Sequence, residues 1–173
     1  MRVVADTNTV VSALLWRGSP HRLIAAIRDY PIAFYTTRAL LDEFARVLSR
    51  GKLARAIRAT GKTTAQLVAE SQGFVNLVTP ASIRSTVPGD PDDDRVLACA
   101  LAAQADLIVS GDAHLLDLKS YQRIPILTAT AALAIIAGAW QRPKQQRPVQ
   151  RPGARGKFSS LAAKHAVHFH SLD

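Results

Sequence analysis

Short apolar runs and longer stretches with helical spacing alternate along the first 140 residues of this chain. Five runs rich in β-branched, aromatic or other apolar residues, bounded by polar or turn-forming residues, predict strands. They lie within residues 2–8, 31–37, 76–80, 107–112 and 124–127. The first and fourth of these segments end in the polar turns DTN and SGD.

Between these runs, apolar residues recur three and four positions apart, which is the spacing of one helix face. After the capping residue Thr37, for example, apolar side chains follow at positions 40, 41, 44, 47 and 48. Further helices are predicted within residues 9–16, 21–30, 52–60, 63–75, 90–105 (with Asp90 as its cap), 111–118 and 128–140. Because strands that alternate with helices form a parallel sheet covered on both faces, we expect a three-layer α/β domain with a central parallel sheet flanked by helices.

The character of the sequence changes after Trp140. Residues 141–173 contain three Arg-Pro pairs and carry a charge of +6 out of the net +9 of the chain. Such a composition buries too little apolar surface to offset the entropy of ordering. We therefore expect one domain over residues 1–140 and a basic, disordered tail over residues 141–173, which either binds nucleic-acid phosphates through charge or serves as a solubilising extension.

Cysteine use and hydropathy restrict the cellular setting. The chain has one cysteine, Cys99, in an apolar helical stretch, so we expect a small buried hydrophobe there and no intrachain disulfide. No stretch approaches the roughly 20 apolar residues that cross a bilayer, and the chain opens on a strand instead of an apolar signal segment. The expectation is a cytoplasmic protein without membrane contact.

Four acidic residues occupy positions that the predicted fold brings together. Asp6 and Asp112 each follow a short apolar run, and ligands of open α/β sheets bind at the carboxyl ends of strands. Glu43 and Asp94 project toward the same edge from predicted helices. Clustered carboxylates raise one another's pKa and need a divalent cation to stay ionised, so the pattern predicts a metal-dependent enzyme.

The run Asp92, Asp93 and Asp94 leaves the choice of helix ligand open. Acidic residues in a first helical turn are favoured by the helix dipole without any function. Asp94 shares an inward face with residues 97, 98 and 101, and Asp93 shares part of that face, so periodicity does not separate the two. His114, two residues after Asp112, is either a phosphate donor or an ordinary surface histidine.

The motifs DTN at residues 6–8, Glu43, the helix that starts at Asp94, and SGD at residues 110–112 occur in an order that resembles the PIN-domain family. These are metal-dependent ribonucleases that include the VapC toxins of bacterial toxin-antitoxin pairs. The resemblance implies that the acidic residues Asp6, Glu43, Asp94 and Asp112 coordinate Mg²⁺ or Mn²⁺, with Asp93 as an auxiliary ligand. It also implies that Thr7, Asn8 and Ser110 orient these carboxylates.

The function implied by this resemblance is hydrolysis of RNA phosphodiester bonds by a toxin that forms a homodimer and binds a cognate antitoxin protein. A non-catalytic RNA-binding or regulatory module with the same fold is an alternative. A second alternative is a haloacid-dehalogenase-like phosphatase, which also begins with a strand ending in Asp. That class needs a second Asp two residues later, where this chain has Asn8.

Overall fold

The computed structural model describes residues 1–86 and 91–141. Its strands are β1 (Arg2–Ala5), β2 (Ala33–Thr36), β3 (Val75–Leu77), β4 (Leu107–Val109), β5 (Ser120–Tyr121) and β6 (Ile124–Leu127). Within the described residues they form one six-stranded sheet in the order β3-β2-β1-β4-β6-β5. All neighbouring pairs are parallel except β5 and β6, so the predicted α/β class and the mostly parallel central sheet are confirmed.

Helices connect these strands and cover the sheet. The α-helices are α1 (Thr7–Leu15), α2 (Ser19–Ala25), α3 (Arg38–Leu48), α4 (Ala54–Ala59), α5 (Thr64–Gln72), α6 (Pro91–Ala103), α7 (Ala113–Asp117) and α8 (Ala129–Gln141). Two one-turn 3₁₀ helices, η1 (Ala26–Arg28) and η2 (Gly51–Leu53), extend α2 and precede α4. Thr37 caps α3 as predicted, because its side chain accepts a hydrogen bond from the Leu40 N–H at 3.3 Å.

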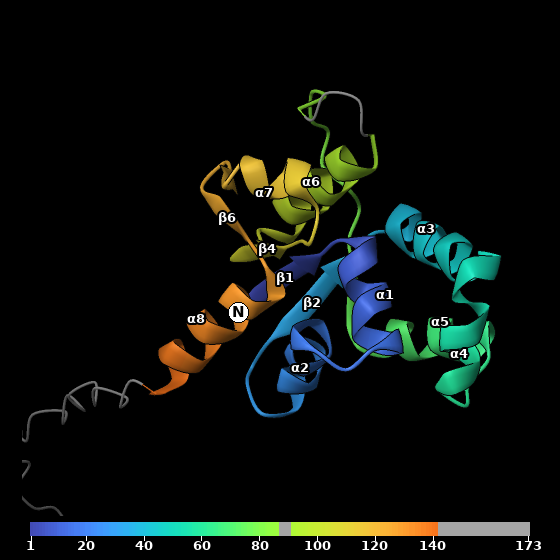
Figure 1. Cartoon of the computed structure of the whole chain (residues 1–173). Coiled ribbons are helices and arrows are strands. Elements are labelled where there is room, and N and C mark those ends of the chain that lie inside the picture. The colour runs from blue at the N-terminus through green and yellow to red at the C-terminus, as the bar shows by residue number, and fades with distance from the viewer. Residues whose placement is uncertain (87–90, 142–173) are drawn as a thin grey trace, which may run out of the picture. The chain divides into compact units, whose positions relative to one another are not determined.

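Alternation along each strand separates two cores. Val3 and Val4 are both fully buried but lie on opposite faces of β1, since neighbouring strand residues point in opposite directions. One face packs against α6 and α7, and the other packs against α2 and α8. Figure 1 shows these helices on the two sides of the sheet, which confirms the three-layer arrangement.

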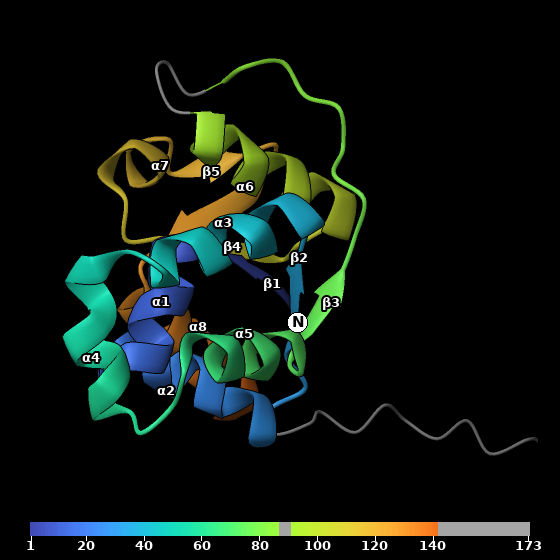
Figure 2. The same cartoon turned by 90° about the vertical axis from the view of Figure 1, so that its right-hand side faces the viewer.

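A third core lies outside the sheet, among α1, α3, α4 and α5. Its buried side chains are Val11, Phe44, Val47, Leu48, Leu53, Ile57 and Leu67. Figure 2 shows α3, α4 and α5 gathered beside α1 in one lobe. Within this lobe α3 packs against α1, the helix that follows the carboxyl end of β1.

The strand order reverses between β1 and β4. From β1 the chain moves outward through β2 and β3, and then returns to place β4 on the other side of β1. In open α/β sheets such a reversal leaves a crevice at the carboxyl ends of the two strands, and ligands bind there. Asp6 follows β1 directly, and residues 110–112 follow β4 directly, so both polar turns lie at this crevice.

Two features differ from the sequence prediction. The helix predicted over 63–75 ends at Gln72, and Val75 already belongs to β3, where it pairs with Phe34. The short strand β5 was not predicted; it forms a hairpin with β6 on one edge of the sheet.

Some predictions concern residues outside the described ranges. The cap Asp90 and, apart from Gln141, the tail 141–173 are among them, so the domain boundary at residue 140 stays a prediction. Over residues 1–86 and 91–141, none of the helices has the length and apolar character required to span a membrane. Cys99 is fully buried as expected, and burial raises the pKa of its thiol to about 12.

Candidate metal centre

Asp6 joins the ends of β1 and β4. It is 5% exposed and caps α1, because its Oδ1 accepts a hydrogen bond from the Thr9 N–H at 2.5 Å. Its Oδ2 accepts hydrogen bonds from the Ser110 hydroxyl and from the Gly111 N–H, the latter at 3.2 Å. The Asp6 N–H continues the sheet by donating to the Val109 carbonyl at 3.0 Å, so this carboxylate is held rigidly.

The Ser110 hydroxyl connects Asp6 to Asp112 through hydrogen bonds. The Ser110 hydroxyl is 1% exposed and also accepts a hydrogen bond from the Asp112 N–H at 2.9 Å. Asp112 in turn caps α7, since its Oδ1 accepts from the His114 N–H at 2.8 Å. Asp6, Ser110 and Asp112 therefore form one connected network, as the two motifs at the strand ends, DTN and SGD, suggested.

Glu43 approaches the same crevice from α3. It is half-buried, while its neighbour Asp42 is exposed, because Glu43 lies nearer the buried stripe that includes Leu40 and Val47. Burial and the negative charge of Asp92 raise the pKa of Glu43, whereas a hydrogen bond from the Thr7 side chain and the charges of Arg95 and Arg46 lower it. Glu43 therefore lies close both to Thr7, the neighbour of Asp6, and to Asp92 at the start of α6.

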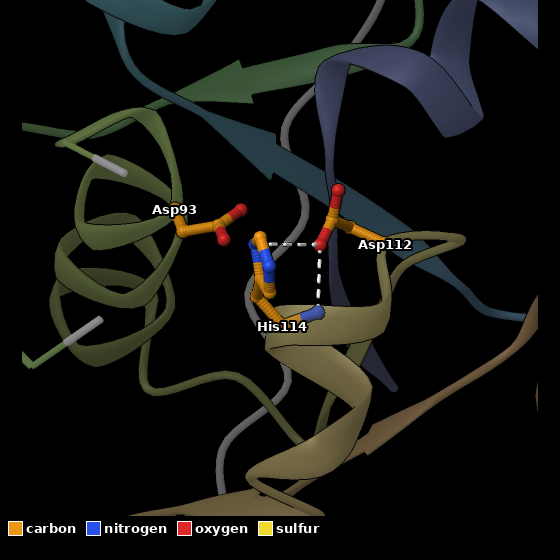
Figure 3. Close-up of side chains that lie close together, drawn as sticks. All are labelled: Asp93, Asp112 and His114. Carbon is orange, nitrogen blue, oxygen red and sulfur yellow. Dashed lines mark hydrogen bonds and ion pairs between the residues drawn. The ribbon is translucent and has the colours of Figure 1, made fainter. Parts of the chain in front are cut away.

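Asp93, Asp112 and His114 form a group of possible metal ligands. One ligand atom from each lies within 4.8 Å of the other two. Figure 3 shows Asp93 on α6 pointing toward Asp112, with the His114 ring between them. Asp93 is 6% exposed, Asp112 is half-buried, and His114 is exposed with its Nδ1 3.6 Å from Asp112 Oδ1.

Asp94 lies outside this group. Its Oδ1 accepts a hydrogen bond from the Thr86 N–H at 2.9 Å, so it faces the segment that precedes α6. The sequence argument preferred Asp94 and kept Asp93 as an auxiliary; the structure instead brings Asp93 to Asp112. The reason is the helix face, because Asp93 shares its burial with Val96, Leu97 and Ala100.

His114 is a residue whose role sequence reasoning left undecided. The available signal was its position two residues after a capping Asp, where the backbone N–H binds the cap and the ring can turn back toward it. Thr7 is buried beside Asp6, as expected of an orienting residue, while Asn8 is exposed. Asn8 lines a groove instead.

This groove opens beside Asp112 and has a volume of about 480 Å³. Its wall is rich in uncharged polar side chains, namely Asn8, Ser12, Ser19, Ser110, Thr128 and Thr130. Hydroxyl and amide groups of this kind hydrogen-bond phosphate and sugar oxygens without selecting a base. The carboxylates therefore border a polar groove of a size that holds a small ligand.

The sequence pattern of the PIN domain matches residues 2–114, which include every acidic residue discussed above. The chain belongs to the PIN-domain family. PIN domains are generally metal-dependent nucleases, so the match supports neither the phosphatase alternative nor a purely structural role for the carboxylates. None of the curated proteins compared with the chain matches it.

The donor set of this PIN domain fits a divalent cation. Two carboxylates and an imidazole converge from α6 and α7, and Asp93 is buried, where a negative charge is costly. Hard cations take carboxylate oxygens, and manganese also accepts imidazole nitrogen. The negative charge of Asp92 also raises the pKa of Glu43. A bound cation would offset this repulsion between the carboxylates.

Proposed function

We propose that this PIN domain is an endoribonuclease that hydrolyses RNA phosphodiester bonds with Mg²⁺ or Mn²⁺. The observation that carries the proposal is the meeting of Asp93, Asp112 and His114 at the crevice between β1 and β4. Asp93, Asp112 and His114 would hold the ion. When bound, a divalent ion activates water and stabilises charge on the scissile phosphate.

The remaining residues of the centre position and charge the site. Asp6 acts through Ser110, whose hydroxyl fixes the backbone of Asp112 and thereby the direction of its carboxylate. Glu43 borders the crevice beside Thr7, and its raised pKa suits it to take up a proton from an attacking water. Asp94 fixes the start of α6 through Thr86 and is not among the ligands proposed.

The groove beside Asp112 supports a nucleic-acid substrate. Its hydroxyl groups can hold the phosphates and riboses on one side of the scissile bond. Since none of these wall residues except Asp112 is charged, they position a backbone and do not read a sequence.

The toxin role is a further part of the proposal, and it rests on the resemblance to VapC toxins. On this proposal the protein acts in the cytoplasm as a homodimer, and a cognate antitoxin protein blocks it until it is released. Co-expression provides the test, because growth arrest by this chain that a neighbouring small protein relieves would support the role. Unimpaired growth at high expression of an active nuclease would contradict it.

Cleavage is tested with total RNA incubated with the purified protein, with and without Mn²⁺, followed by mapping of the new ends. We expect cleavage that requires the ion and is lost in Asp112→Asn. Asp117→Asn is the matched control, because Asp117 is an exposed carboxylate near the end of α7. Mn²⁺-independent ends, or equal activity in both variants, would contradict the proposed centre. RNA binding without any cleavage would favour the non-catalytic RNA-binding module.

A further inference from the structure

Positive charge is concentrated on the lobe formed by α3, η2 and α4. No acidic residue lies between Glu43 and Glu70, whereas the same segment contains six basic residues. All six are exposed. They are Arg46, Arg50, Lys52, Arg55, Arg58 and Lys62, and we call them the basic arm.

The arm is built on a rigid base. Leu53 and Ile57 are buried in the third core and anchor η2 and α4 against α3. Arg55 and Arg58 lie three positions apart, so they share an outward face of α4 and continue one row of charge. The spacing of these charges is therefore set by the fold and is not left to a flexible segment.

The arm begins at the metal centre. Arg46 lies three residues after Glu43 on α3, and its charge is close enough to act on the Glu43 carboxyl. From there the basic residues run along the end of α3, through η2 and onto α4. A polyanion bound along the arm is thus led to the crevice that holds Glu43.

Little inside the protein neutralises these charges. Among the described residues, Lys62 is the only member of the arm in an ion pair, with Glu70 at 2.5 Å and on an exposed surface. Like charges gathered on a surface create a positive potential that attracts phosphates. The segment 45–69 also contains no aromatic residue, so it offers no platform for stacking bases.

We propose that the basic arm binds the sugar-phosphate backbone of single-stranded RNA, independently of sequence, and guides it to the metal centre. That the RNA is guided to the metal centre rests on the proposed nuclease function, whereas RNA binding along the basic arm does not. Fixed cations without aromatic neighbours suit a backbone of regularly spaced phosphates. An acidic protein segment is the competing ligand that the experiment must exclude.

The test compares two triple variants of the full chain, each with three exposed basic residues replaced. The arm variant carries Arg50→Gln, Arg55→Gln and Arg58→Gln, and it spares Arg46 because of its place beside Glu43. The control carries Arg22→Gln, Lys119→Gln and Arg123→Gln, which removes the same charge outside the arm. A third variant with lysine at the three arm positions keeps the charge.

Binding of a fluorescent oligouridylate is followed by anisotropy in EDTA, from about 50 to about 200 mM salt. Each phosphate contact contributes about 0.7 to the log-log salt slope for single strands, so the arm variant should lose up to about 2 from that slope and bind more weakly at low salt. The control and the lysine variant should keep the slope of the natural chain. Melting temperatures verify that all variants are folded.

Equal slopes in the arm variant and the natural chain, or equal losses in the arm variant and the control, would overturn the proposal. Unchanged RNA affinity together with lost binding of a polyglutamate peptide would overturn it in favour of a protein ligand. Because EDTA prevents metal-dependent cleavage, these outcomes are independent of the nuclease test. A chain that fails to cleave RNA but binds it through the arm would contradict only the proposed activity.

Discussion

Adjacent aspartates on α6 have different surroundings, although their chemistry is identical. Consecutive helix residues point about 100° apart, since a turn contains about 3.6 residues. That rotation places Asp93 in the buried stripe that faces Asp112, and it turns Asp94 toward the Thr86 N–H. A rotation of one residue thus decides which aspartate lies beside Asp112 and His114.

Asp93 and Asp94 allow a matched comparison of Mn²⁺ affinity by titration calorimetry. We expect Asp93→Asn to lower the affinity for Mn²⁺ at least about tenfold, because it removes a negative charge from the proposed ion site. Asp94→Asn should retain the affinity, since an amide oxygen can still accept from the Thr86 N–H. A loss confined to Asp94→Asn would return the ligand role to the residue that the sequence favoured.

Glu43 gives a pH dependence whose sign is fixed by its environment. Its pKa is raised above the ordinary 4.5, first by burial and then by Asp92, so folding favours the protonated form. The resulting stabilisation is full below the ordinary pKa and is lost as the pH rises through the folded-state pKa. In EDTA, therefore, Glu43→Gln should be more stable than the natural chain at neutral pH, and this advantage should shrink below pH 4.5.

Urea unfolding at several pH values measures this difference. Glu70→Gln is a suitable control, because Glu70 is an exposed glutamate on α5. A pH-independent difference between Glu43→Gln and the natural chain would mean that Glu43 does not carry the shifted pKa.

At the scale of elements, the β5–β6 hairpin contains a strand, β5, that the sequence pattern did not predict. The loop of this hairpin is Gln122 and Arg123, whose φ angles are 45° and 70°. Two-residue hairpin turns favour positive φ, and Asn-Gly is the residue pair that adopts it with least strain. The chain uses neither residue, so the usual signal of a hairpin is missing from the sequence.

Replacing the loop with Asn-Gly should therefore stabilise the domain. A left-handed backbone costs an ordinary residue about 1–2 kcal/mol, and we expect the free energy of unfolding to rise by about 1–2 kcal/mol in Gln122→Asn, Arg123→Gly. Urea unfolding provides the measurement. The double alanine variant should show no such gain, and an equal gain in both would mean that the side chains, not the backbone, strain the turn.

At the scale of the whole molecule, the proposed metal centre would connect α6 with α7 beside the two central strands. An ion held by residues from both helices binds the folded chain and not the unfolded one, so it stabilises the fold by mass action. At a free concentration of about 100 times its Kd, the gain is about 2.7 kcal/mol.

Thermal melting in EDTA and in excess Mn²⁺ should show this gain as a higher Tm. Asp112→Asn should abolish most of the shift, whereas Asp117→Asn should keep it. Identical midpoints for the natural chain in the two buffers would mean that the described carboxylates form no site of useful affinity.

Much of the fold follows from patterns that are local in the sequence. The alternation of apolar runs with helical stretches identified five of the six strands, and the stripe after Thr37 gave α3 its buried face. Such patterns are reliable because each strand or helix must bury one face, whatever its partner. The same reasoning placed Asp6 and Asp112 at strand ends, since a polar turn after an apolar run must lie beyond the end of the strand.

The tertiary structure decided what depends on neighbours far apart in the chain. The sheet order places β1 beside β4, and only then do Ser110 and Asp6 meet across 104 positions of sequence. The rotation of α6 selected Asp93 over Asp94, and the turn of α7 brought the His114 ring between Asp93 and Asp112. Periodicity describes the face of one helix. Which residue at the edge of that face points toward Asp112 is decided by the packing of α6 against α7 and the sheet.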